Sequence, residues 1–184
     1  MEIRISTTQI LKILNILSWI IFIGLCIEAG GIIFNAFFTH FINPDAAKSF
    51  WKEIDLSNLY SYDYGYFFVA TTLMSIVAIM KAILFYLIVK ILYDKKLNLL
   101  DPFNKELRNL ILNVSYLTLG IGIFSFWGIN YTVWLINLNV RMPNFEDLGF
   151  SGADVWVFMS VILFVIAQIF KRGIELQEES DLTI

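Results

Sequence analysis

Two ionisable residues, Glu28 and Lys81, lie inside long apolar stretches of the sequence. A charge at the centre of a bilayer costs at least about 2.5–3.5 kcal/mol on insertion scales, so it generally faces other helices and has a partner. Counted from the ends of their stretches at about 1.5 Å per residue, the two side chains lie within about 7 Å of the same depth. We therefore expect a Glu28–Lys81 ion pair. It would act either as a latch between helices or as a proton-, ion- or ligand-responsive site.

Small residues accompany both charges. Gly24 and Gly31 share a helical face with Glu28, and the second stretch carries a comparable stripe made of Thr71, Ser75, Ala78 and Ala82. Small side chains let helices approach closely inside a membrane. We expect the first two helices to pack through these faces.

The remaining sequence offers no catalytic constellation. With one cysteine, Cys26, and one histidine, His40, a Cys/His zinc cage cannot form within one chain. Walker, Rossmann and HExxH patterns do not occur. The formal net charge of −3 does not indicate a basic nucleic-acid surface. We expect a non-enzymatic protein with no metal, no cofactor and no direct nucleic-acid binding.

The composition is that of an integral membrane protein. Hydrophobic residues make up 58% of the chain and charged residues 16%, and the mean hydropathy is +0.72. Four apolar stretches predict spans at about 13–38, 66–92, 107–138 and 155–171. The expected fold is all-α, a single transmembrane domain over residues 1–184 that forms a four-helix bundle.

Lysine and arginine lie mainly on one side of these spans. That side carries Arg4, Lys12, Lys90, Lys95, Lys96, Lys105, Arg108, Lys171 and Arg172. The other side carries Lys48, Lys52 and Arg141. The positive-inside rule therefore predicts that both termini and the connection 93–106 are cytoplasmic, and that the connections 39–65 and 139–154 are outside.

The first outer connection contains a helix start, because Asn43 can cap a helix whose first residue is Pro44. Phe50, Trp51 and Ile54 then fall on one helical face. This pattern predicts a short amphipathic helix on the outer membrane surface. A helix that caps the bundle without touching lipid is the alternative. The third connection is expected to be a short, turn-rich outer loop.

The cytoplasmic side combines a short connection with an acidic tail. Asp101 and Pro102 precede the third apolar stretch and predict the start of its helix. The tail, residues 172–184, carries Glu175, Glu178, Glu179 and Asp181. It is either a solvated terminus or a docking segment. As a docking segment, it would contact Lys95 and Lys96 of the connection or a basic partner protein.

Two motifs resemble a bacterial membrane family catalogued as domain of unknown function 2975, the YoaS-like proteins. Members finish in E-N-D-L-T-V, and this chain finishes in E-S-D-L-T-I over residues 179–184. Members also carry N-P-F-S/T in the inner connection, where this chain has D-P-F-N over residues 101–104. The segment KAILFYLIVKI is similar to members from Bacteroidota.

The resemblance implies four transmembrane helices, the bacterial cytoplasmic (inner) membrane and no established activity. Family members are often encoded beside a very small helix-turn-helix regulator, which implies a cytoplasmic DNA-binding partner. Docking candidates are therefore Asp101, Pro102, Phe103, Glu175, Glu178, Glu179, Asp181 and Leu182.

The leading hypothesis is a membrane regulator or sensor that presents the cytoplasmic connection and tail to a partner. A small ion or solute transporter or channel using Glu28 and Lys81 is one alternative. An accessory subunit of a larger membrane complex is another, and a homo-oligomer is compatible with each of the three.

Overall fold

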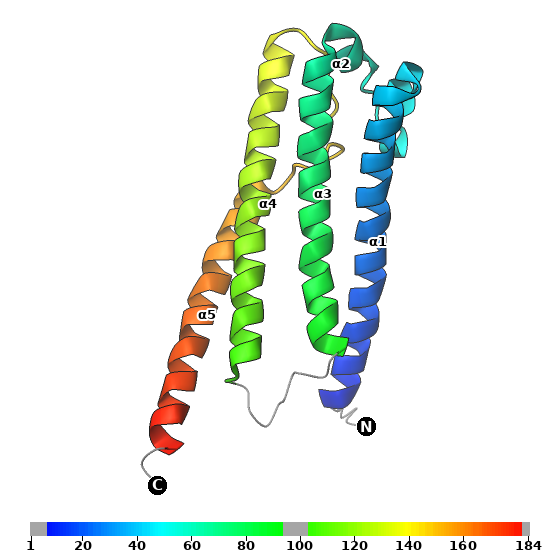
Figure 1. Cartoon of the computed structure of the whole chain (residues 1–184). Helices are drawn as coiled ribbons and strands as arrows, with labels where there is room; N and C mark the ends of the chain where they lie inside the picture. The colour runs from blue at the N-terminus through cyan, green and yellow to red at the C-terminus, as the bar shows by residue number, and fades with distance from the viewer. Residues whose placement is uncertain (1–6, 94–102, 182–184) are drawn as a thin grey trace, which may run out of the picture.

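The computed structural model describes residues 7–93 and 103–181, and these are almost wholly helical (Figure 1). The long helices are α1 (Thr7–Phe41), α3 (Tyr64–Tyr93), α4 (Lys105–Asn137) and α5 (Ala153–Asp181). Between α1 and α3 lie two 3-10 helices, η1 (Pro44–Ser49) and η2 (Trp51–Glu53), and the short α2 (Ser57–Tyr62). Each long helix has the length and apolar composition needed to cross a membrane. The all-α prediction with four spans is confirmed.

The four long helices stand in a row (Figure 1). Helix α1 packs on α3, α3 on α4 and α4 on α5, whereas no helix contact joins α1 to α4 or α5 in the described parts of the chain. The bundle is therefore open. In the most apolar 18-residue window of each helix, 6% of the residues are buried in α1 but 33% in α3 and α4. Most of the surface of α1 is left for lipid or for another protein.

Small residues set the close approach of α4 to its neighbours. A Cβ added at Gly122 would lie 2.6 Å from Val157 Cγ2 and 3.1 Å from the Ala153 carbonyl oxygen. Ser115 Oγ also donates a hydrogen bond to the Ser160 carbonyl, at 2.8 Å. The small face predicted on α1 behaves differently. Nothing lies near a Cβ at Gly24, and Gly31 makes room for the Trp51 ring instead of α3.

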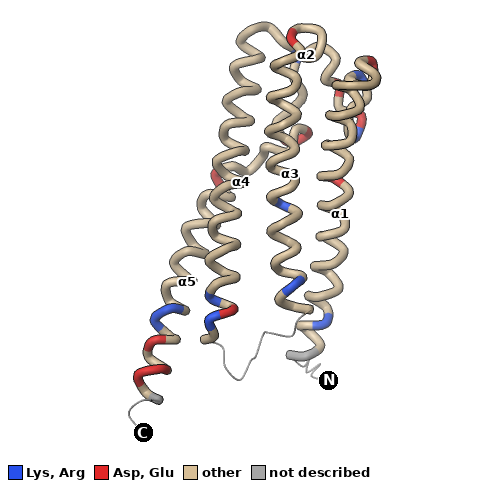
Figure 2. Tube along the Cα trace, in the orientation of Figure 1, with Lys and Arg blue, Asp and Glu red and all other residues tan. Residues whose placement is uncertain are grey.

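The two ends of the row differ. One end carries the start of α1, the end of α3, the start of α4 and the end of α5, and we call it the terminal end; the other carries the first and third connections, and we call it the capped end (Figure 1). Lysine and arginine occur near the terminal end of every long helix (Figure 2), at Lys12, Lys90, Lys105, Arg108, Lys171 and Arg172. The assignment of this end to the cytoplasm by the positive-inside rule stays a prediction.

The first connection folds onto the bundle as separate turns. Its predicted start is confirmed, because the Asn43 side chain accepts a hydrogen bond from the Asp45 backbone N–H at 3.1 Å. The expected continuous amphipathic helix is wrong. The chain breaks at Phe50, and Lys52 has a left-handed φ of 56°.

The reason for the break is burial of the apolar residues inside the protein. Phe50 is 1% exposed and Ile54 8% exposed, and both belong to the hydrophobic core. Their backbones pair, with the Phe50 N–H donating to the Ile54 carbonyl at 2.9 Å. The structure therefore shows the alternative, a cap on the bundle, although its helices are short 3-10 turns.

The third connection is more than a surface loop. From the end of α4 it turns back along the length of the bundle and passes α3. It reaches a level halfway along α4 before α5 begins (Figure 1). Leu148 and Phe150 are each 1% exposed, and the Phe150 ring packs on Gly128 of α4. Gly149 and Gly152 take positive φ values of 77° and 75°, which favour glycine. We call residues 138–152 the returning segment.

Helix α5 starts halfway along α4, opposite Gly122, and continues beyond the predicted span end at residue 171 to Asp181. The polar residues after Phe170 include Lys, Arg, Glu and Gln, which are good helix formers. The tail is therefore an extension of α5 as far as Asp181, not a separate terminus.

Candidate functional site

The expected ion pair between Glu28 and Lys81 does not form. Glu28 Oε1 lies 3.2 Å from Lys52 Nζ of η2, and Lys81 Nζ donates a hydrogen bond to the Gly149 carbonyl at 2.9 Å. The prediction failed because it considered only the two helices. The folded first connection and the returning segment supply nearer partners for both charges.

Lys81 joins three parts of the molecule. It projects from α3, bonds the backbone of the returning segment, and its Nζ lies 6.0 Å from the centre of the Trp156 ring on α5. The contacts of Lys81 hold the returning segment and not α1, so the latch predicted between α1 and α3 also loses its ion pair. The transporter hypothesis loses the pair on which it was based.

The docking candidates at the terminal end come together in space. The Phe103 ring lies against Phe170, with ring centres 5.4 Å apart, and a Cβ added at Gly173 would lie 2.5 Å from it. Next to it, Lys105 Nζ lies 2.8 Å from Glu178 Oε1. Phe103 and Lys105 thus attach the start of α4 to the tail. We call this assembly, residues 103–106 with 171–180, the terminal-end surface.

The acids of the tail have cationic neighbours on the same helix. Arg172 Nη1 lies 3.1 Å from Glu175 Oε2 and 4.0 Å from Glu179 Oε1, and Lys171 Nζ lies 3.9 Å from Glu175 Oε1. All these side chains are at least 41% exposed. Exposed ion pairs contribute about 0–1 kcal/mol, so the acids can exchange these partners for others at low cost.

The remaining candidates lie at or beyond the limits of the described chain. Asp101, Pro102 and Leu182 lie outside the described residues, as do Lys95 and Lys96, and Asp181 is the last residue of α5. The helix predicted to start at Asp101 and Pro102 starts a few residues later. Helix α4 begins at Lys105, and the Asn104 side chain caps it by accepting a hydrogen bond from the Leu107 N–H at 2.7 Å.

The sequence did not reveal Lys105 as the partner of Glu178 or Gly149 as the partner of Lys81. The returning segment did carry a signal, because Leu148 and Phe150 are apolar residues within a stretch of turn residues. No group of three His, Cys, Asp or Glu side chains suited to a metal ion occurs in residues 7–93 and 103–181.

The fold and these contacts define a multi-pass α-helical membrane protein. The chain belongs to the family described as Protein of unknown function (DUF2975), whose model matches residues 36–184. Comparison with curated proteins gave no match, and neither did comparison with solved structures.

Proposed function

We propose that the protein is a non-enzymatic membrane regulator that presents the terminal-end surface to a cytoplasmic partner protein. The observation that supports this most is the continuity of α5. The helix runs unbroken from its apolar part to Asp181, and Phe103 holds the tail against the start of α4. A partner would therefore meet an ordered surface built from two segments of the chain.

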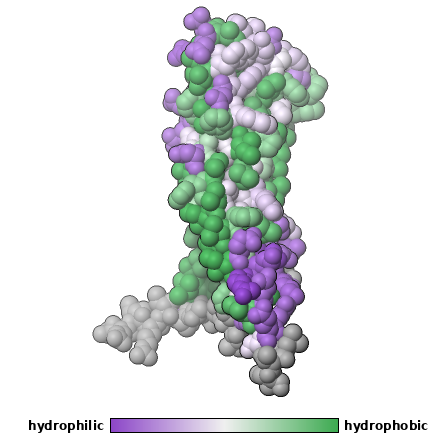
Figure 3. Space-filling view, turned by 90° about the vertical axis from the view of Figure 1, so that its left-hand side faces the viewer, coloured by the Kyte–Doolittle hydropathy of each residue, from purple (hydrophilic) through white to green (hydrophobic). Residues whose placement is uncertain are grey.

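The chemistry of the tail suits a basic partner. Glu175, Glu178 and Glu179 lie on an exposed helix, and Figure 3 shows hydrophilic side chains gathered at this end below a hydrophobic surface. Leu176 is 51% exposed among these charges. An apolar residue surrounded by exchangeable ion pairs is a suitable contact for a partner, because its burial adds free energy while the acids select for positive charge.

The expected partner is the small helix-turn-helix regulator implied by the family resemblance. Such a regulator would carry a basic DNA-binding surface. Binding it at the membrane would keep that surface away from DNA. In this way a membrane protein without enzymatic activity would control transcription.

The proposal is tested by removing the end of the tail. Deletion of residues 180–184 leaves all four spans, so we expect normal insertion and loss of co-purification with the regulator. The matched point variant is the triple change Glu175→Gln, Glu178→Gln and Glu179→Gln. The control is the same change of charge at the capped end, Asp45→Asn, Asp63→Asn and Glu146→Gln. Undiminished recovery of the partner with both tail variants would contradict the proposal.

An accessory subunit of a larger membrane complex is the second candidate. The observation that favours it is the open row, in which most of α1 remains exposed. Co-purification from native membranes in a mild detergent would recover further membrane subunits if this role is correct.

A further inference from the structure

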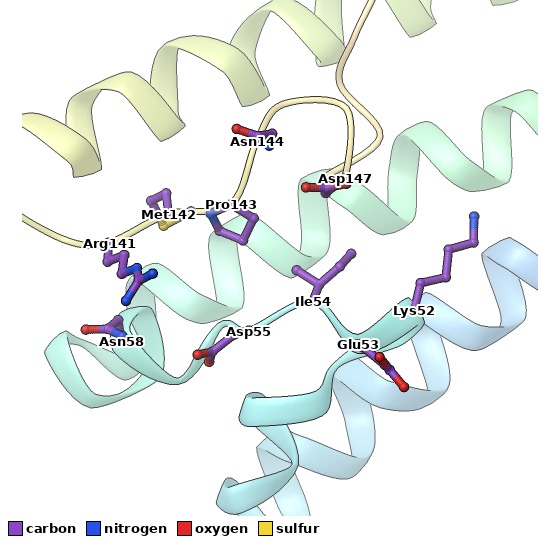
Figure 4. Close-up of a pocket in the computed structure, with 10 residues that line it drawn as sticks. All are labelled: Lys52, Glu53, Ile54, Asp55, Asn58, Arg141, Met142, Pro143, Asn144 and Asp147. Carbon is purple, nitrogen blue, oxygen red and sulfur yellow. The ribbon is translucent and has the colours of Figure 1, made fainter.

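A polar cleft of about 430 Å³ opens at the capped end, between the first connection and the returning segment (Figure 4). One wall comes from residues 52–58 and the other from residues 141–147. This volume falls within the range of small-molecule sites, about 300–1,000 Å³. No feature of the proposed function uses this cleft.

Several charges in the cleft already have partners. Lys52 pairs with Glu28 at 3.2 Å. Asp55 Oδ1 accepts hydrogen bonds from the Ser57 N–H at 2.9 Å and the Ser57 hydroxyl at 2.6 Å. These bonds lower the pKa of Asp55 below its ordinary value, and Arg141 adds a smaller effect of the same sign. Asp55 is therefore an anion that the protein itself stabilises at neutral pH.

Two charges are left for a ligand. In the described chain, the guanidinium of Arg141 and the carboxylate of Asp147 make no hydrogen bond or ion pair, and Arg141 acts on Asp55 only through its charge at longer range. Figure 4 shows Arg141 beside Asn58 at one end of the cleft, Asp147 toward the other, and the apolar side chains of Ile54 and Pro143 between them. The carboxylate of Glu53 points away from the returning segment (Figure 4). The two side chains of opposite charge that lack a hydrogen bond or an ion pair, Arg141 and Asp147, thus lie apart along the cleft.

We propose that this cleft binds a small zwitterion with a carboxylate at one end and an ammonium group at the other, as in a free amino acid or a dipeptide. The planar fork of Arg141 suits a carboxylate, and Asp147 accepts hydrogen bonds from an ammonium group. Ile54 and Pro143 cover the aliphatic part of the ligand. A simple anion would leave Asp147 without a partner, and a simple cation would leave Arg141 without one, so only a molecule that carries both signs pairs with both charges.

The site deepens the proposed function by naming the class of signal that the regulator would sense. The returning segment forms one wall of the cleft, is bonded by Lys81 at Gly149 and leads directly into α5. A ligand that moves this wall would therefore act on the helix that ends in the terminal-end surface. Binding itself requires no partner protein, so failure of this inference is distinguishable from failure of the proposed function.

The test is calorimetric titration of the full chain in nanodiscs with glycyl-leucine and with free leucine. N-acetyl-glycyl-leucine lacks the ammonium group, and glycyl-leucinamide lacks the carboxylate. We expect saturable binding of at least one free zwitterion and a Kd at least about tenfold weaker for its capped forms. A charge-assisted hydrogen bond of about 1.5–3 kcal/mol corresponds to at least that factor.

Variants assign each end of the ligand. Arg141→Gln should weaken binding at least about tenfold and make the Kd values of glycyl-leucine and glycyl-leucinamide equal. Asp147→Asn should also weaken binding at least about tenfold, and it should make the Kd values of glycyl-leucine and N-acetyl-glycyl-leucine equal. Glu146→Gln and Lys48→Gln change charge nearby but outside the cleft and should bind as the unaltered chain does. All four side chains are exposed, so the variants should retain the helical signal and the unfolding midpoint. Failure of every zwitterion to bind at millimolar concentration, or binding that neither cleft variant weakens, would overturn the inference.

Discussion

At the scale of single residues, each of the two charged side chains within the apolar stretches has a partner in a connection between helices. Lys81 hydrogen-bonds the Gly149 carbonyl and Glu28 pairs with Lys52. The position of each residue along its helix was predictable, because helical rise converts sequence position into distance. Their partners were not, because they lie in segments whose path depends on tertiary contacts such as those of Phe50 and Phe150.

Replacement of Lys81 tests its bond to the returning segment. Lys81→Met should lower the free energy of unfolding by about 1–3 kcal/mol, because the Gly149 carbonyl would lose its partner. Lys90→Met makes the same change at an exposed position of α3 and should have little effect. Thermal unfolding in detergent, followed by circular dichroism, measures both. Equal unfolding midpoints for the two variants would show that the bond does not hold the returning segment.

At the scale of elements, the interface between α4 and α5 depends on missing side-chain volume. Gly122→Ala would place a methyl group 2.6 Å from Val157 Cγ2, so the helices would have to separate. We expect destabilisation by about 1–3 kcal/mol, as for an overpacked core. Gly24→Ala is the matched control, since nothing lies within 4 Å of the added carbon. It should be neutral or stabilising by up to about 1 kcal/mol, and the same unfolding measurement compares the two variants.

The tail is attached to the start of α4 by two kinds of contact, ring packing and an ion pair, which separate substitutions can test. Phe103→Ala removes the ring that lies against Phe170 and Gly173, and we expect a loss of about 1 kcal/mol for a half-buried side chain. Lys105→Gln removes an exposed ion pair and should cost less. Hydrogen exchange of residues 173–181 is the measurement. Faster exchange in Lys105→Gln than in Phe103→Ala would reverse the assigned roles.

The elements show where sequence alone is sufficient. The four spans follow from runs of apolar residues, and Asn43 with Pro44 correctly marks a helix start. The end of α5 was not predictable from hydropathy, because the apolar run stops at Phe170 while the helix continues. The polar residues that follow have high intrinsic helix propensity. The returning segment was recognisable as turns, but its position inside the bundle is set by Lys81 and Gly128 of other helices.

At the scale of the whole molecule, the row is longer than the hydrocarbon core. Helix α1 has 35 residues, which span about 52 Å, whereas the core is about 30 Å thick. Lysine and arginine occur near the terminal end of every long helix, and α5 begins only at the level of the middle of α4, opposite Gly122. The parts of α1, α3 and α4 beyond this level extend toward the capped end, where the connections cover them.

Orientation can be measured with single cysteines on a Cys26→Ala background. Ser61→Cys lies at the capped end and Gln177→Cys on the tail, and both positions are exposed. If the positive-inside rule holds here, an impermeant maleimide will label Ser61→Cys on intact cells and Gln177→Cys only after permeabilisation. The opposite pattern would place the terminal end outside and remove a cytoplasmic partner from consideration.

The central claim, that the tail of α5 docks a partner protein, is tested most directly by a photo-reactive amino acid at Leu176 in living cells. The control position is Phe158, which is 65% exposed on the apolar part of α5. We predict a discrete protein adduct from position 176 that disappears when residues 180–184 are deleted, and no such adduct from position 158. The absence of an adduct at position 176, or an adduct that survives the deletion unchanged, would contradict the claim.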